Sequence, residues 1–334
     1  MNKFSVAMVF GAALAAVGLS AQGAVTNYWA QSSGGSWSTG TWTAKNADGS
    51  EAAVVHNADR VYDFSELASG ETVTCDVDKV QPIGFVFAKK AEGDNWTLVS
   101  ATGKNLTLRD KKPVVVVPEG TTLNFQMLTA NAYGGSIEMT FTGGGTVNFN
   151  SAAWKPYCMR VILDGTKLVL QKDTEPMVFR LIGDDAKLTF AAAATVMGFE
   201  STGTGTPTVD IGSFNVFTKG GFSGYSPCSY GGYMKGSAVL TITGGVTQRF
   251  TLPDAFKDFT GEVKCENGDL YMCEGALMND NRTLNLSLYG RFCSSNDQTV
   301  AAIKGEGVSG GVDIPAGRTF TAGKAGVTAP TTMA

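Results

Sequence analysis

The clearest pattern in the chain is a short run of alternating apolar and polar residues that follows a Gly, Asp or Asn and then recurs. Two such runs align without a gap, RVILDGTKLVL at residues 160–170 and RLIGDDAKLTF at residues 180–190. The offset between them is 20 residues, and a fixed period of about 20 residues is typical of a solenoid. The aligned charged residues are Arg160 with Arg180, Asp164 with Asp184, and Lys167 with Lys187.

Shorter segments extend the pattern in both directions. They are TFTGGGTVNF (140–149), TVDIGSF (208–214), NLTL (105–108), TLNF (122–125), VLTI (239–242) and LNLSL (284–288). Because side chains alternate across a strand, each segment places its apolar residues on one side. Val147, Leu168 and Leu188 then form one row, and Phe149, Leu170 and Phe190 form the next.

Stacked in register, these rows make a continuous apolar column, which is how a parallel β-helix buries its core. We therefore predict an all-β, right-handed parallel β-helix. The alternative is a β-sandwich of antiparallel hairpins, but its strands would recur every 8–12 residues, and the apolar signatures recur at about twice that spacing. An irregular loop at residues 220–236 interrupts the period, either as a lateral excursion or as a binding surface.

Glycine content supports a chain of strands and turns. The sequence has 42 glycines among 334 residues, and glycine disfavours helix interiors while allowing turns with positive φ. Helix is expected mainly at the N-terminus, where Lys3 precedes an apolar stretch (6–19) and a small-residue site, Ala-Gln-Gly, ends at residue 23. We predict a helical signal peptide at 1–23, because the apolar run is shorter than the ~20 residues of a membrane span.

Signal cleavage would leave 334 − 23 = 311 residues and change the net charge from −4 to −5, through the loss of Lys3. Nucleic-acid binders gather Lys and Arg on one face, so this mildly acidic protein is not expected to bind nucleic acid. The apolar content after residue 23 also predicts no transmembrane span. An exported protein would meet an oxidising compartment, in which disulfides are allowed.

The six cysteines leave two interpretations open. Six thiols allow 15 pairings, and Cys265 and Cys273 are close enough in sequence to form a local disulfide across ENGDLYM. Alternatively, all six are small buried side chains. A zinc site is not expected, because the chain has no C-x-x-C pair and His56 is its single histidine. We expect no metal or cofactor.

Two sets of residues are candidates for function. The aligned charges, together with Asp185, could line a groove that holds an anionic sugar and act on it as acids and bases; this set comprises Arg160, Asp164, Lys167, Arg180, Asp184, Asp185 and Lys187. The alternative is a ladder of charges on solvated corners, inherited with the repeat. The second set is Trp29, Trp37 and Trp42, which could stack on glycans or cover an open end of the solenoid. No nucleophile, zincin or P-loop motif accompanies either set.

One segment carries a family resemblance. FTGEVKCENGDL (259–270) resembles the autotransporter-associated β-strand repeat of exported bacterial proteins, and the matching residues are Phe259, Thr260, Gly261, Val263, Gly268 and Leu270. Glu262 and Cys265 depart from that pattern. The Trp-rich start, followed by ADRVYDF and TVTCDVD, is similar to the segment that begins such passengers after the signal peptide.

The resemblance implies a β-helical passenger with a signal peptide (1–23), a Trp-rich aromatic cap with the first coils (24–100), and β-helix repeats (101–334). It implies an adhesin-like structural scaffold without catalysis, located at the cell surface, in the periplasm or outside the cell. Host or envelope glycans and surface proteins are the expected partners. The family's C-terminal translocator barrel is not evident, which leaves the secretion route and anchor open. The alternatives are a carbohydrate-active β-helix enzyme, either a polysaccharide lyase or a hydrolase, and a β-sandwich carbohydrate-binding module.

Overall fold

A computed structural model describes residues 24–108, 112–127, 129–131, 137–150, 154–155, 159–173, 177–220, 227–273, 275–278, 283–306, 310–323 and 332–333. The predicted signal peptide at 1–23 lies outside these residues, as do Cys158 and residues 221–226 of the predicted irregular loop. The described chain is built from strands joined by short corners. It contains no helix of the length and apolarity required to cross a membrane.

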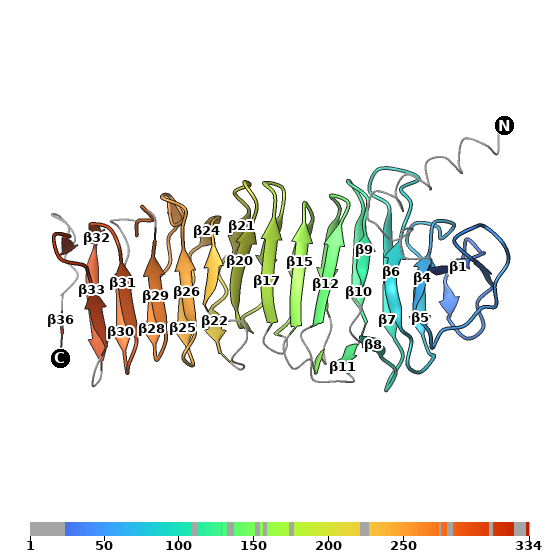
Figure 1. The fold of residues 1–334 in the computed structure, drawn as a ribbon, viewed down its shortest axis with the longest axis horizontal. Helices are drawn as coiled ribbons and strands as arrows, with labels where there is room; N and C mark the ends of the chain where they lie inside the picture. Colours follow the sequence, from blue (N-terminus) through green and yellow to red (C-terminus); the bar gives the residue numbers. More distant parts are fainter. Residues whose placement is uncertain are drawn as a thin grey trace.

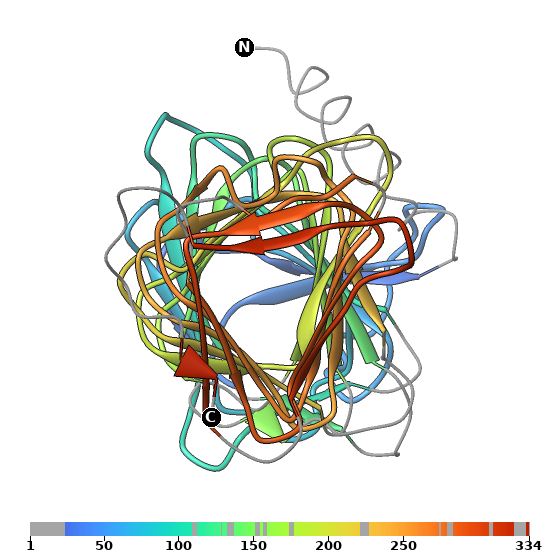
Figure 2. The ribbon, with the colours of Figure 1, turned by 90° about the vertical axis from the view of Figure 1, so that its left-hand side faces the viewer.

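The strands stack into an elongated solenoid with a roughly triangular cross-section (Figures 1 and 2). Successive strands in the chain pass from one face of the triangle to the next, and each strand pairs with the strand one turn away. The ladders between the named strands are parallel, and β1 with β3 is the antiparallel exception. The predicted all-β class and parallel stacked coils are confirmed, and the β-sandwich alternative is wrong.

Face 1 begins with a nine-stranded sheet and continues in a five-stranded sheet, with β20 lying beside β23. The first sheet contains, in spatial order, β3 (Trp42–Lys45), β1 (Val25–Trp29), β4 (Arg60–Asp63), β6 (Pro82–Val86), β9 (Val114–Val116), β12 (Ile137–Thr142), β15 (Met159–Asp164), β17 (Met177–Ile182) and β20 (Gly198–Thr202). The second contains β23 (Cys228–Tyr230), β26 (Thr247–Phe250), β29 (Asp269–Met272), β31 (Arg291–Ser294) and β34 (Gly311–Asp313).

Face 2 begins with a ten-stranded sheet and ends in a two-stranded sheet. The first comprises β2 (Gly35–Ser36), β5 (Thr72–Cys75), β7 (Asn95–Ser100), β10 (Thr122–Gln126), β13 (Thr146–Phe149), β16 (Lys167–Leu170), β18 (Lys187–Phe190), β21 (Thr208–Asp210), β24 (Tyr233–Gly236) and β27 (Asp258–Phe259). The second comprises β32 (Gln298–Val300) and β35 (Phe320–Ala322).

Face 3 has a three-stranded sheet followed by a seven-stranded sheet. Their strands are β8 (Leu106–Leu108), β11 (Thr129–Asn131) and β14 (Trp154–Lys155), then β19 (Ala194–Val196), β22 (Val216–Lys219), β25 (Leu240–Thr243), β28 (Val263–Glu266), β30 (Thr283–Ser287), β33 (Ala302–Glu306) and β36 (Thr332–Met333).

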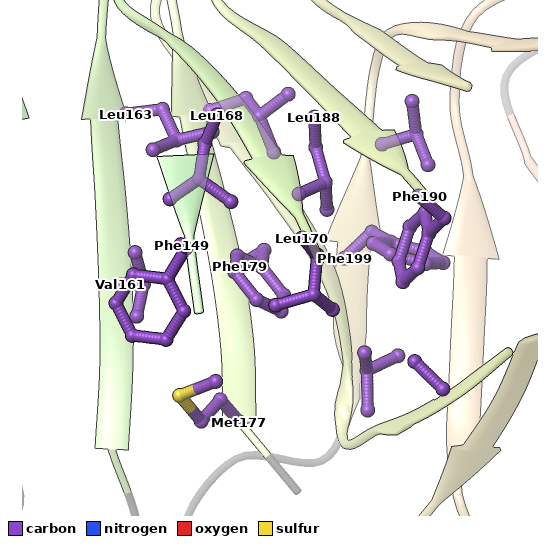
Figure 3. Close-up of a cluster of buried hydrophobic side chains, with 14 of the residues drawn as sticks. Phe149, Val161, Leu163, Leu168, Leu170, Met177, Phe179, Leu188, Phe190 and Phe199 are labelled. Carbon is purple, nitrogen blue, oxygen red and sulfur yellow. The ribbon is translucent and has the colours of Figure 1, made fainter. Parts of the chain in front are cut away.

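The predicted apolar column is present inside face 2. Val147 pairs with Leu168 and Leu168 with Leu188, while Leu170 lies between Phe149 and Phe190 in the neighbouring row. All six side chains are buried. Figure 3 labels five of them, all except Val147, and shows these five directed into the interior beside residues of face 1. Burying each such side chain stabilises the fold by about 1.5–3 kcal/mol. Since each coil is covered by the next, this energy holds neighbouring coils together.

The 20-residue alignment is correct for face 2 and wrong for face 1. Lys167 pairs with Lys187 as predicted, but Arg160 pairs with Val178, and Ile162 pairs with Arg180. The cause lies in the corners, because residues 165–166 join β15 to β16 whereas residues 183–186 join β17 to β18. The longer corner shifts the register by two residues. A shift of two keeps every side chain on its original side of the sheet.

The segment FTGEVKCENGDL occupies parts of all three faces. Phe259 ends β27 on face 2, Val263 and Cys265 lie in β28 on face 3, and Leu270 lies in β29 on face 1. These four side chains are buried. Gly261 turns the chain at a close approach between coils, where a Cβ atom would lie 1.8 Å from the carbonyl oxygen of Ala238. The recurring residues of this segment therefore form the corners and core of one coil.

Replacing Gly261 with alanine is expected to lower the free energy of unfolding by about 1–3 kcal/mol, because the added methyl group must displace the Ala238 backbone. Urea denaturation followed by circular dichroism measures this loss. Gly311→Ala is the matched control, because a Cβ atom there would meet nothing within 4 Å and the residue does not have the positive φ of glycines such as Gly245. Equal stability losses in the Gly261 and Gly311 variants would contradict the close-contact explanation.

Two fully buried glutamines form hydrogen bonds at the points where one sheet ends and the next begins, one on face 1 and one on face 2. Gln248 Nε2 donates to the carbonyl oxygen of Phe199 at 3.0 Å, and its Oε1 accepts from Phe199 N at 2.9 Å. This side chain connects β26 in the second sheet of face 1 to β20 in the first. Gln298 does the same at the start of β32, where its Oε1 accepts from Met278 N and its Nε2 donates to Ala276 O. Both side chains thus satisfy buried backbone groups at these junctions.

Candidate functional site

A connected group of charged side chains lies on the outer surface of face 1, across β12, β15, β17 and β20. Arg160 Nη1 lies 2.7 Å from Glu138 Oε1, and Arg160 Nε lies 3.0 Å from Glu200 Oε2. Arg180 Nη2 lies 2.8 Å from the same Glu200 oxygen. Arg160 thus reaches past β17 to join two carboxylates. We call Lys112, Glu138, Arg160, Arg180 and Glu200 the face 1 network.

Both carboxylates of the face 1 network are engaged by two cations. Lys112 Nζ contacts Glu138 Oε2 at 2.8 Å, opposite Arg160, and Glu200 receives both guanidinium groups. Burial disfavours the charged form of Glu138, but the hydrogen bonds and charges of Lys112 and Arg160 outweigh burial and lower its pKa. A general acid requires a raised pKa near the working pH. Glu138 is therefore held as an anion and is not prepared to donate a proton.

The residues of the predicted groove do not converge on one site. Arg160 and Arg180 lie on face 1, whereas Lys167 and Lys187 point outward from face 2, where Lys187 contacts Asp210 at 3.2 Å. Asp184 and Asp185 lie on the exposed corner between those faces. Asp184 Oδ1 accepts hydrogen bonds from the backbone N and hydroxyl of Thr206, at 2.7 and 3.1 Å, and so orders the next corner. Asp164 ends β15 and pairs with Ile182, not with Asp184.

The acidic partners, Glu138 and Glu200, were missed by the sequence analysis. Glu138 occupies an outward position in IEMTFT, an alternating segment that lies opposite 159–164 in the ladder. Glu200 lies in GFEST, whose apolar alternation is too short to be recognised. Correct register was required to find them, since Glu138 pairs with Arg160, and Glu200 pairs with Arg180.

The three tryptophans of the N-terminal segment pack together in an aromatic cluster. Trp29 and Trp37 are 0% and 1% exposed, and Trp42 is half-buried. The rings of Trp37 and Trp42 stack at 5.7 Å, and Trp29 meets Trp42 edge-on at 4.9 Å. Phe64 lies within 6.2 Å of all three ring centroids. Trp29 and Trp37 therefore offer no open ring face to a glycan.

His56 lies against the same aromatic cluster. Its ring is 5.2 Å from Trp42 and stacks on Tyr62 at 5.9 Å, and its Nδ1 is buried without a hydrogen-bond partner. Burial lowers the pKa of His56, and the positive charge of Arg60 lowers it further by a smaller amount. The negative charge of Asp76 raises this pKa, but by less. The folded protein therefore holds this imidazole neutral at neutral pH.

A His56→Gln variant is expected to lose part of the protein's sensitivity to mild acid. The pKa of His56 is lower in the folded than in the unfolded state, so between these two pKa values the unfolded chain binds more protons. Stability contributed by neutral His56 is complete above about pH 6.5 and is lost as pH falls below it. The melting temperature of both proteins is measured at pH 7.5 and at pH 5.5. Its fall between these two pH values should be smaller in the variant. An unchanged difference would contradict this assignment.

The described cysteines are thiols, and no disulfide joins Cys265 to Cys273. Cys265 is completely buried in β28, where burial raises the pKa of its thiol. Burial likewise raises the pKa of Cys75 to about 12. A thiol with a raised pKa is neither a nucleophile nor a metal ligand at neutral pH. Cys75, Cys228, Cys265 and Cys293 are buried, as the second interpretation expects, whereas Cys273 is partly exposed.

No grouping of three or more His, Cys, Asp or Glu side chains suited to a metal ion occurs among the described residues. The face 1 network is thus an ion-paired surface with three cations and two carboxylates. No family model, curated protein or solved structure matches the chain.

Proposed function

We propose that this protein is an exported, non-catalytic scaffold that presents the outer faces of its solenoid to glycans or surface proteins. The observation that carries the proposal is the register of face 2, where outward side chains line up over successive coils. Asn148 Nδ2 donates to Asn124 Oδ1 at 2.9 Å, and Asn124 Nδ2 donates to Thr97 Oγ1 at 3.3 Å. Such ladders give a long, rigid surface on which repeated contacts can add.

The engagement of both face 1 carboxylates supports a scaffold rather than an enzyme. A polysaccharide lyase or hydrolase needs an acid or base that can exchange a proton at the substrate. Glu138 and Glu200 are instead tied to Lys112, Arg160 and Arg180. A carbohydrate-active enzyme would instead form products from a polysaccharide substrate.

We also propose the handedness of the solenoid and the role of its aromatic cluster. Coils that connect parallel strands in one sheet are right-handed in nearly all proteins, so we assign a right-handed solenoid. We assign the aromatic cluster of Trp29, Trp37 and Trp42 as a cap for the N-terminal end. The antiparallel strand β3 ends the nine-stranded sheet beside it, and an open end would otherwise expose strand edges and core side chains.

Export through a signal peptide at 1–23 is also part of the proposal, with a cell-surface, periplasmic or extracellular location of the autotransporter-passenger type. It is supported by the position of β1, which starts at Val25 and pairs with β4 inside the first sheet of face 1. The first described strand thus starts two residues after the predicted cleavage site. Intact-mass measurement of the exported protein should give residues 24–334, and retention of residues 1–23 in the exported protein would contradict the signal assignment.

The function is tested by incubating the mature protein with neutral and anionic polysaccharides. Reducing ends and unsaturated uronide products are measured, and sedimentation of the same polysaccharides reports binding. We expect retention on at least one polysaccharide or cell surface and no product above the level of a heat-denatured control. Saturable product formation that is lost in Glu200→Gln would overturn the proposal in favour of an enzyme.

A further inference from the structure

A surface cavity lies where face 2 changes from its ten-stranded to its two-stranded sheet. The first sheet ends at β27 and the second begins at β32, and the described residues between β29 and β30 (273 and 275–278) contribute no strand to either. The cavity at this break has a volume of about 390 Å³, within the range of about 300–1,000 Å³ found for small-molecule sites. It is lined by Pro253, Asp254, Lys257, Leu277, Met278, Asp297 and Thr299.

Hydrogen bonds fix the walls of this cavity from behind. Gln298 is 2% exposed and holds the backbone of Met278 and Ala276 at 2.9 and 2.8 Å. On the opposite side, Leu277 N donates to Pro253 O at 3.0 Å. Asp297 Oδ1 accepts from Thr319 N at 2.8 Å, which orients that carboxylate. A site whose walls are already ordered loses less conformational entropy when it binds a ligand.

The lining combines an apolar wall with polar groups at its rim. Pro253, Leu277 and Met278 supply the wall, and Leu277 is 45% exposed. Two carboxylates, one ammonium group and one hydroxyl supply acceptors and donors. Lys257 Nζ is held 4.1 Å from the ring centroid of Tyr233, an outward residue of face 2. The cavity therefore adjoins the row of outward side chains on that face.

We propose that this cavity binds one sugar unit of a neutral oligosaccharide. A sugar ring has an apolar C–H face that fits the Pro253 and Leu277 wall, and hydroxyl groups at its edge that can donate to Asp254 and Asp297 and accept from Lys257. The two aspartates and one lysine leave the lining with a net charge of −1, which disfavours uronates and other anionic sugars. This inference rests on the proposed function of a non-catalytic scaffold, and it names the class of ligand that one part of the scaffold's surface binds.

The test uses the mature protein and six tetrasaccharides. Five are neutral, namely cellotetraose, laminaritetraose, maltotetraose, mannotetraose and chitotetraose, and tetragalacturonate is the anionic comparison. Isothermal titration calorimetry measures binding to the wild-type protein, to Leu277→Ala and to Asp254→Asn. The matched controls are Leu288→Ala, whose leucine is 46% exposed elsewhere, and Asp185→Asn on an exposed corner. Thermal melting establishes that each variant remains folded.

We expect at least one neutral tetrasaccharide to bind, with at least tenfold weaker binding in both cavity variants and unchanged binding in both controls. Tetragalacturonate should bind at least tenfold more weakly than that neutral ligand. The inference is overturned if no neutral tetrasaccharide binds, if tetragalacturonate binds as well, or if the cavity variants bind like the wild type. Chromatography of the recovered ligand separates this inference from the proposed function, because cleaved products would contradict the non-catalytic scaffold whether or not the cavity binds.

Discussion

Replacing Gln248 with methionine is expected to lower the free energy of unfolding by about 3–6 kcal/mol. Gln248 is completely buried and bonds both the N–H and the carbonyl oxygen of Phe199, with a further donation to Cys228 O at 3.3 Å. Methionine has a similar length and volume, so it leaves little cavity but makes none of these bonds. Each buried backbone group that loses its partner costs about 1–3 kcal/mol.

The effect of Gln248→Met should be greatest where the two sheets of face 1 meet. In a solenoid, stability depends on contacts between neighbouring coils, so weakening one junction uncouples the parts on either side. We expect urea denaturation to become less cooperative and hydrogen exchange to rise first in β20 and β23. Gln126→Met, on the partly exposed outer side of β10, is the matched control and should change stability by less than about 0.5 kcal/mol. Equal losses in both variants would contradict the role given to Gln248.

The core of the solenoid could be predicted from the sequence because alternation is a local property. In KLVL and KLTF, the apolar residues occupy every second position, so Leu168, Leu170, Leu188 and Phe190 face inward whichever coil lies next to them. The need for glycine at position 261 is different, because it comes from the carbonyl oxygen of Ala238 in the neighbouring coil. Alternation alone is determined within a few residues of sequence.

The charged surface could not be predicted in the same way, because it depends on register between coils. Equal spacing was assumed for Arg160 and Arg180, but the longer corner at 183–186 places Arg180 beside Ile162. The network with Glu138 and Glu200 follows from that shift. A gapless alignment of the two repeats does not show where each strand ends, so it does not show how long the corner after it is.

The buried glutamines contradict the alternation rule, and that contradiction was itself a signal. In TQRF and QTV, Gln248 and Gln298 occupy inward positions where the pattern calls for an apolar residue. A buried polar side chain must find partners, and both occur where a face changes sheets. In this solenoid, both inward glutamines therefore mark a break in the ladder.

Leu168→Pro is expected to remove protection from hydrogen exchange in β16 and in the strands on both sides of it, β13 and β18. Proline has no N–H for the ladder, and its ring also replaces a leucine that is 0% exposed between Val147 and Leu188. The lost ladder contact adds to the lost burial of about 1.5–3 kcal/mol. Leu168→Ile keeps both the N–H and the volume, so it should cost less than about 1.5 kcal/mol.

The spatial spread of the Leu168→Pro effect distinguishes a stack of coupled coils from separate compact domains. If each coil is stabilised mainly by its neighbours, protection in wild-type protein should extend from about Leu106 to Leu286, and in the variant it should fall most at residue 168 and recover with distance on both sides. Hydrogen exchange with mass spectrometry measures this profile strand by strand. A segment next to β16 that keeps full, cooperative protection in the variant would contradict nearest-neighbour coupling, because its core would then be independent of the coil that Leu168 completes.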